Sequence, residues 1–146
     1  MYYKTVRIQV LYTATPPLHN SILTILAEYF KSVLPSTHSL FVDLPTENPI
    51  STIFNSLRPD LVIQFNNKLA VLELTVCHET NFEKAKQRKL NKYSHLENNL
   101  NSAFQGHDIL LSSVEISVLG FISGLNPFCK LLKIMKVPEV IFNNIT

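Results

Sequence analysis

Two carboxylate residues, Asp60 and Glu73, lie in two apolar runs separated by Asn66 and Asn67, within the stretch RPDLVIQFNNKLAVLELT (58–75). The runs are rich in Val, Leu and Ile, which predicts two strands, and the Asn pair predicts a hairpin turn, although Asn-Gly would be a stronger signal. A two-residue turn at this point places Asp60 directly opposite Glu73. Opposed side chains have Cβ atoms about 4.5–5.5 Å apart, so like charges there are destabilising. The two carboxylates therefore require a bound cation or a shared proton.

The oxygen ligands of this pair favour Mg²⁺ or Mn²⁺, because Mg²⁺ often binds through one or two carboxylates and keeps waters for substrate phosphates. Asp60 has a local alternative as a strand-start residue after Pro59. Glu73 is harder to explain by local structure, because the sequence AVLELTV is apolar on both sides of it. Thr75 is expected on the same face as Glu73, since side chains two residues apart share a face of a strand.

The segment after the second run is predicted to be a helix from the residues TNFE (80–83) to about Phe104. TNFE matches a capping box, with Thr80 as the N-cap and Glu83 three residues on. Gly106 marks the expected end. The apolar residues of the segment recur at helical spacing and form one stripe, which consists of Phe82, Ala85, Tyr93, Leu96 and Leu100.

Lys89 falls in the middle of this apolar stripe, where an unpaired charge is costly. Either its ammonium group extends along the surface to solvent, or it points back at the sheet toward Asp60 and Glu73. In the second case two carboxylates, a metal ion and a cation converge. That combination suits metal-assisted hydrolysis of a phosphodiester, in which the metal activates water and offsets developing charge and the lysine assists.

Basic residues gather on the same predicted helix. The stretch KAKQRKLNK (84–92) holds five of the thirteen Lys and Arg residues of the chain and no acidic residue. The formal net charge is only +2, so the cluster is a local feature, and such a feature favours a polyanion partner. The alternative is an ordinary solvated helix face.

The rest of the chain supplies the elements that would position these residues. An opening strand-like run is interrupted at 13–20, and a helix then starts near Asn20 or Ser21 and stops at Pro35. A strand is predicted over 38–44. Further on, 107–121 predicts one kinked strand or two, and a helix follows over about 126–136. With the hairpin and the basic helix, this order predicts an α/β (α+β) fold, a mixed sheet flanked by helices.

Length and composition limit the class of protein. The 146 residues predict one domain, 1–146, and 46% of them are hydrophobic. No apolar run reaches the roughly 18 residues of a membrane span, and the first residues lack the plan of a signal peptide. Cys77 and Cys129 show neither metal-site spacing nor a disulfide framework. We therefore expect an intracellular protein, and a nuclear one if its host is a eukaryote.

The chemistry-bearing residues resemble a known signature. Pro59-Asp60 followed by Glu73-Leu74-Thr75 resembles the PD-(D/E)XK signature of restriction-like endonucleases, and the predicted order α-β-β-β-α-β is similar to the core of that superfamily. The stretch ELTVCHETNFEKAKQRKLNKYSHL resembles the endonuclease domains of non-LTR retrotransposons. The stretches HNSIL, VDLP and VEISVLGF also resemble that group. The resemblance covers about 18–123, and its extended pattern over 58–96 is much more specific than the bare signature.

The resemblance implies Asp60 and Glu73 as ligands of Mg²⁺ or Mn²⁺. Thr75 departs from the short signature, which has a lysine there; in this group the lysine is thought to come from the following helix, which implies Lys89. Thr75, Glu79 and Tyr93 are expected to support the site, with Glu79 and Tyr93 orienting the lysine.

The superfamily often has a further acid on its first helix. Glu28 is the only acid on the predicted first helix, but it lies well away from the centre of the apolar face. Asp43, on the strand that follows, is the rival candidate. His78 is interpreted as a polar loop residue and His19 as structural, while Cys77 is assigned to packing.

The implied activity is that of a metal-dependent DNA endonuclease, which nicks a duplex with little sequence choice. Its expected phosphate contacts are Lys84, Lys86, Arg88 and Lys92, which position DNA but do not read bases. Related domains sit beside a reverse transcriptase and zinc-finger DNA readers. Such parts do not fit in 146 residues, so the chain is an excised domain, a degenerate copy or a free-standing descendant, and in the last case a reverse transcriptase or DNA-targeting domain would act in trans. Cleavage of both strands would need a homodimer or a second encounter.

Two other classes stay open. One is a catalytically inactive nucleic-acid-binding module that uses the same basic helix. The other is a structural or interaction domain in which Asp60 and Glu73 only cap and pair locally.

Overall fold

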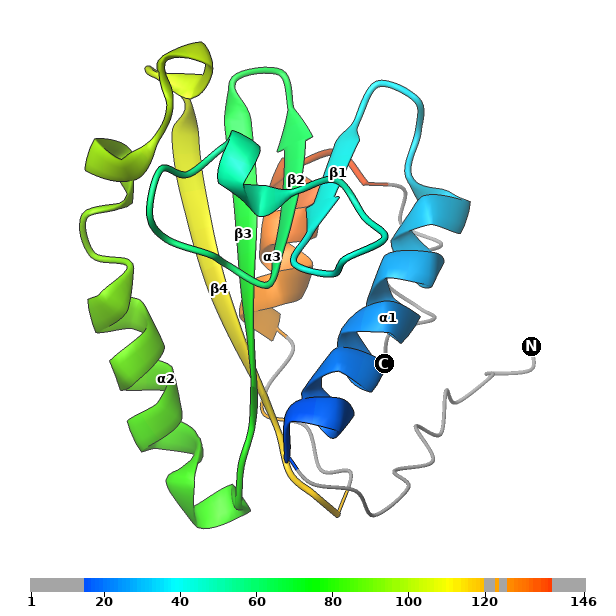
Figure 1. The fold of residues 1–146 in the computed structure, drawn as a ribbon, viewed down its shortest axis with the longest axis vertical. Coiled ribbons are helices and arrows are strands. Elements are labelled where there is room, and N and C mark those ends of the chain that lie inside the picture. Colours follow the sequence, from blue (N-terminus) through cyan, green and yellow to red (C-terminus); the bar gives the residue numbers. More distant parts are fainter. Residues whose placement is uncertain (1–14, 120–122, 124–125, 138–146) are drawn as a thin grey trace.

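The computed structural model describes residues 15–119, 123 and 126–137. Four strands form one sheet in the order β1-β2-β3-β4, and helices lie on both of its faces (Figure 1). The elements are α1 (Thr15–Val33), β1 (Ser39–Val42), β2 (Leu61–Phe65), β3 (Lys68–Val76), α2 (Phe82–Lys92), β4 (Asp108–Ile116) and α3 (Asn126–Ile134). The prediction of an α+β fold with a mixed sheet flanked by helices is confirmed, as is the element order from the first helix on.

The hairpin of β2 and β3 has the predicted register. Leu61 pairs with Leu72 and Phe65 with Lys68 across a two-residue turn. Asn66 adopts a positive φ of 52°, which asparagine tolerates better than most residues. Antiparallel pairing also joins β1 to β2, whereas β3 and β4 run parallel. A parallel pair needs a long crossover connection, and α2 lies within it.

The second half of β3 extends past the end of its hairpin partner. β2 begins at Leu61, opposite Leu72, so within the described sheet the part of β3 from Glu73 onward pairs with β4 alone. This leaves one side of Glu73 open to groups from outside the sheet. The candidate site lies at this step in the sheet.

Alternate residues of β3 belong to two separate cores. Even-numbered residues such as Leu72 pack with α1 and α3, and odd-numbered residues such as Val71 pack with Tyr93 and the segments around it. The period of two that defines a strand produces this division. Glu73 has odd parity, so its side chain is on the face that α2 covers.

The start of α1 differs from the prediction. The helix begins at Thr15, not near Asn20 or Ser21. Pro16 and Pro17 fall in its first turn, where proline is tolerated because the missing N–H would have no partner within the helix. The earlier start places His19 inside the helix.

The helix α2 also differs from the prediction. It ends at Lys92, not near Phe104, and two short 3₁₀ turns follow at Leu96–Asn99 and Ser102–Phe104. Asparagine side chains bind the local backbone there, since Asn99 donates to the carbonyl of His95 at 3.0 Å and Asn101 accepts from the N–H of Ala103 at 3.0 Å. Such local bonds compete with a continuous helix.

The predicted capping box is not formed. A 3₁₀ turn over Glu79–Asn81 precedes α2, and Asn81, not Thr80, is the N-cap. The Thr80 N–H instead donates to the His78 side chain at 3.4 Å.

The remaining elements lie close to their predicted places. β4 is one strand, without a break at Ser112 and Ser113, but it ends at Ile116, short of the predicted 121, and α3 ends two residues before the predicted 136. The predicted opening strand lies outside the described residues. No described helix is both long and apolar enough to cross a membrane.

The buried face of α1 gives the first testable expectation. The side chain of Phe30 is fully buried, whereas Ile25 on the same helix is 41% exposed. We expect Phe30→Ala to lower the free energy of unfolding by about 3–5 kcal/mol and Ile25→Ala to change it by about 0.5 kcal/mol or less. Urea denaturation measures both, and equal losses would contradict the assignment of this helix face to the core.

Candidate active site

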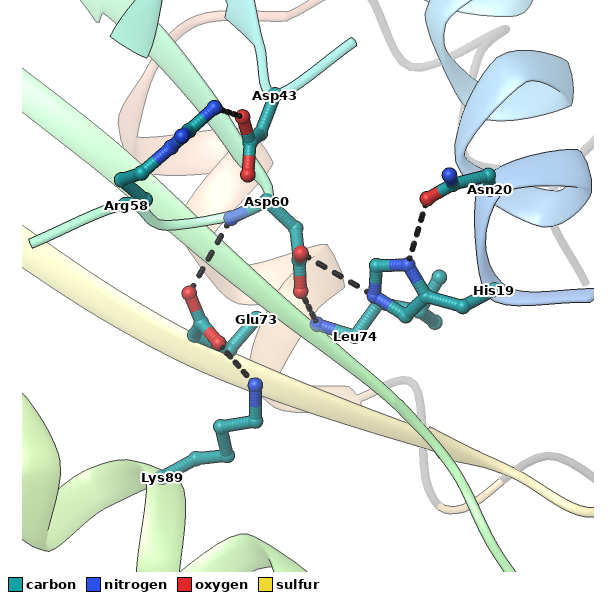
Figure 2. A network of polar contacts seen from close by, with 8 residues as sticks. All are labelled: His19, Asn20, Asp43, Arg58, Asp60, Glu73, Leu74 and Lys89. Carbon is teal, nitrogen blue, oxygen red and sulfur yellow. Dashed lines mark hydrogen bonds and ion pairs between the residues drawn. The ribbon is translucent and has the colours of Figure 1, made fainter. Parts of the chain in front are cut away.

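The predicted hairpin register brings Asp60 beside Glu73 at the step in the sheet, although the paired ladder itself ends at Leu61 and Leu72 (Figure 2). The Asp60 backbone N–H donates to Glu73 Oε1 at 3.2 Å, and the Leu74 backbone N–H donates to Asp60 Oδ2 at 2.7 Å. Each carboxylate is therefore held by the backbone of the opposite segment. Asp60 is 7% exposed and Glu73 only 1%, so the pair is largely withdrawn from water.

Lys89 reaches this pair from α2. Its Nζ lies 2.7 Å from Glu73 Oε2 (Figure 2). Ala85 and Tyr93, one turn before and after it, are buried against the sheet, and residues four apart share a helix face. Of the two alternatives for this lysine, the one that points at the sheet is confirmed.

The charges at the site are only partly balanced. The pKa of Glu73 is raised above its ordinary value, because burial and the nearby Asp60 carboxylate disfavour its charged form more strongly than Lys89 favours it. A further positive charge would stabilise this carboxylate in its ionised form.

His19, interpreted from the sequence as structural, also reaches the site. Its Nε2 lies 3.1 Å from Asp60 Oδ1, and its Nδ1 lies 3.2 Å from Asn20 Oδ1 (Figure 2). The hydrogen bond to Asp60 raises the pKa of His19. His19 stands four residues before Leu23 on the buried face of α1, and that spacing is the signal that could have identified it.

The two candidates for a further acid differ in position. Glu28 lies on α1 with its side chain 68% exposed and paired with Lys31 at 3.5 Å, so the structure does not bring it to the site. The Asp43 backbone N–H donates to the Asp60 carbonyl at 2.9 Å, which places this residue beside the site. Its carboxylate, however, is paired with Arg58 at 2.6 Å (Figure 2).

Two of the predicted supporting residues place hydroxyl groups on the α2 face of the sheet. Thr75 is 7% exposed and Tyr93 only 2%, and the buried Thr75 hydroxyl has no hydrogen-bond partner among the described residues. Burial and the nearby Glu73 carboxylate raise the pKa of Tyr93. The Tyr93 hydroxyl is therefore placed to interact with Glu73.

Glu79, the third predicted supporting residue, makes different contacts. A hydrogen bond from Ser117 lowers its pKa, and its Oε2 lies 3.6 Å from His78 Nε2. These contacts do not link it to Lys89, so its predicted role of orienting the lysine stays a prediction.

A buried acid that the sequence did not single out lies further along the same face. Glu115 on β4 is 1% exposed and pairs in register with Thr75. Its two carboxylate oxygens accept from the hydroxyls of Ser113 at 2.8 Å and Ser123 at 2.7 Å. After Asp60 and Glu73, it is the third buried carboxylate among the described residues.

The donor set fits a metal ion that keeps most of its waters. Asp60 and Glu73 supply hard oxygen ligands, and each oxygen has a second lone pair besides the one that accepts a protein hydrogen bond. The raised pKa of Glu73 indicates that a cation would be favourable there. Within residues 15–119, 123 and 126–137, no three His, Cys, Asp or Glu side chains gather as a metal-holding group. Mg²⁺ often binds proteins through only one or two carboxylates, so the oxygen ligands of Asp60 and Glu73 would suit Mg²⁺ or Mn²⁺.

Basic side chains line the exposed flank of α2. Lys84, Arg88 and Lys92 are exposed and four residues apart, so they form one row beside the buried row that contains Lys89. Lys86 is half-buried on another part of the helix. None of these four cations forms an ion pair in the described part of the chain. Their charges are free to meet a polyanion.

Comparison with known proteins assigns no family. No protein-family model matches the chain, and a search of curated proteins finds no significant match. A functional conclusion therefore has to rest on the site itself.

The pH dependence of stability tests the contact between His19 and Asp60. The pKa of His19 is raised above its ordinary value of 6.5, so the folded protein binds more protons than the unfolded chain, and the free energy of unfolding falls as pH rises. This contribution is fully present below about pH 6.5 and is lost as pH rises through the raised pKa. We expect thermal denaturation of the wild type to show this loss, and His19→Gln, which cannot titrate, to show a smaller one. Identical pH profiles would contradict the contact.

Proposed function

We propose that this protein is a metal-dependent DNA endonuclease with a restriction-endonuclease-like core, which hydrolyses one phosphodiester bond at a time and so nicks a duplex. The observation that supports this most is the convergence of Asp60, Glu73 and Lys89, with Lys89 Nζ 2.7 Å from Glu73 Oε2. The sequence predicts each of these residues from its own segment, and the resemblance to PD-(D/E)XK endonucleases gives all three a role in the same reaction.

Two kinds of group would act at the site: the carboxylates would hold the metal ion, and Lys89 would donate hydrogen bonds. A bound Mg²⁺ or Mn²⁺ would activate a water molecule and offset the charge of the phosphate, and Asp60 and Glu73 would hold it. Lys89 has three N–H donors, one of which Glu73 accepts. The other two can hold a phosphate oxygen and the attacking water, and fixed donors of this kind stabilise developing charge.

The exposed row on α2 would position the DNA. Lys84, Arg88 and Lys92 run along the flank of the helix whose buried row contains Lys89, so a phosphate backbone that follows the row passes close to the site. Contacts to phosphates orient a duplex without reading its sequence. Weak sequence preference is the expected result.

A second candidate function is a catalytically inactive nucleic-acid-binding module of the same fold. Lys89 already pairs with Glu73, and both Glu73 oxygens accept hydrogen bonds from the protein. This arrangement holds together without a metal ion, and it leaves the basic row of α2 free to bind DNA.

Nicking of supercoiled plasmid in Mg²⁺ or Mn²⁺ separates the two functions. We expect the wild type to nick, and Asp60→Asn, Glu73→Gln and Lys89→Met each to slow nicking by about 100-fold or more, since each removes a preorganised charged group. Glu28→Gln is the matched control, because Glu28 is an exposed acid away from the site, and it should keep the wild-type rate. Nicking that survives Glu73→Gln would overturn the proposed site, and salt-sensitive DNA binding without nicking would favour the inactive module.

The salt dependence of DNA binding tests the basic row. Each phosphate contact that is lost should reduce the slope of log K against log salt by about 0.9 for duplex DNA. We expect this reduction for Lys84→Gln, Arg88→Gln and Lys92→Gln, measured by fluorescence anisotropy. Lys130→Gln is the control, because Lys130 is exposed on α3, which packs on the opposite face. An equal effect of Lys130→Gln would indicate general electrostatic attraction instead of a defined DNA-binding surface.

A further inference from the structure

We infer that His19 is a positioning residue for the active site, which fixes the orientation of the Asp60 carboxylate at the step in the sheet. This inference rests on the proposed function, because a positioning role has meaning only if the pair binds and acts. It adds α1 to the elements that build the site, which otherwise come from the hairpin and α2.

Asp60 needs outside support because it lies just beyond the sheet. β2 begins one residue later, at Leu61, so the backbone ladder does not by itself fix the Asp60 side chain. The Leu74 N–H holds Oδ2 at 2.7 Å, and His19 Nε2 holds Oδ1 at 3.1 Å. One hydrogen bond leaves a carboxylate free to turn about that contact, whereas two donors on its two oxygens fix the plane of the group.

The His19 ring has a polar contact on each side. Nε2 must carry a hydrogen, because its partner is a carboxylate oxygen, and Nδ1 lies 3.2 Å from Asn20 Oδ1, which accepts a hydrogen bond when the ring is protonated on both nitrogens (Figure 2). Below the ring, Leu23, Ala27 and Phe30 continue the same face of α1 and are fully buried. The helix is thereby anchored to the sheet, and His19 is presented to Asp60 from a rigid element. Sites supported in this way hold their geometry more tightly than sites on loops.

The position of His19 at the rim supports positioning over simple packing. Its side chain is 26% exposed, while that of Asp60 is 9% exposed. The apolar face of α1 is complete from Leu23 onward without it, so the core does not depend on the imidazole. What His19 supplies is a directed donor to a buried carboxylate, the contribution that partners of metal-binding carboxylates usually make.

Three substitutions at this one position provide the test. His19→Ala removes the donor. His19→Gln places an amide N–H close to the position of Nε2, whereas the shorter His19→Asn reaches only as far as Nδ1. Nicking rates are compared at saturating DNA and saturating Mg²⁺, at a temperature where circular dichroism shows each variant to be folded.

We expect His19→Ala to lower the maximal nicking rate by about 10–100-fold, the usual cost of losing such a partner, with a much smaller change in KM for DNA. His19→Gln should recover most of the rate, and His19→Asn should not. A purely structural role would change the fraction of folded protein and leave the rate of the folded enzyme unaltered.

Two results would overturn the inference, and they differ from failure of the proposed function. A wild-type rate in folded His19→Ala would overturn the inference alone, as would equal rates for His19→Gln and His19→Asn. A wild type that does not nick in either metal would overturn the proposed function and the positioning role together.

Discussion

Asp60 and Glu73 are two acidic residues joined by a hydrogen bond from the Asp60 backbone N–H to Glu73 Oε1, and both lie in a largely dry part of the protein, with residue exposures of 7% and 1%. Leaving a buried charge without its partner costs about 3–5 kcal/mol, so the charges of this pair have to be balanced. Donors from three elements balance them here: the hairpin backbone, Lys89 on α2 and His19 on α1. The packing of α1 and α2 against the sheet therefore brings donors to this pair of carboxylates. Buried like charges cost stability, and such costly arrangements are typical of functional sites.

Local patterns predicted the centre of this site because they act over short stretches of chain. A two-residue turn and the period of two determine which residue Asp60 faces, and the structure has that register. The position of Lys89 in an apolar stripe followed from helical spacing, and the buried Ala85 and Tyr93 on either side hold it toward the sheet. Asp60, Glu73 and Lys89 could thus be placed together without knowledge of the tertiary fold.

Two kinds of feature were not predicted: helix ends that depend on competing local hydrogen bonds, and contacts between segments that are far apart in the sequence. Pro16 and Pro17 were interpreted as a break in the chain, but they lie in the first turn of α1. His19 was therefore not placed on the helix. Its contact with Asp60 joins residues that are far apart in the sequence. The end of α2 was misplaced, because side chains such as Asn99 and Asn101 bind the local backbone after Lys92. Of the two open candidates for a further acid, Glu28 is exposed and paired with Lys31, which agrees with its predicted position away from the apolar face of the helix.

The central claim is that the two carboxylates form a divalent-metal site, and titration with Mn²⁺ followed by electron paramagnetic resonance tests it most directly, without DNA or turnover. Asp60→Asn combined with Glu73→Gln keeps the size of both side chains and removes both charges, while Glu28→Gln removes an exposed acid elsewhere on the protein. The wild type and Glu28→Gln should each bind a Mn²⁺ ion that the double variant does not bind. Equal Mn²⁺ binding by the wild type and the double variant would contradict the claim.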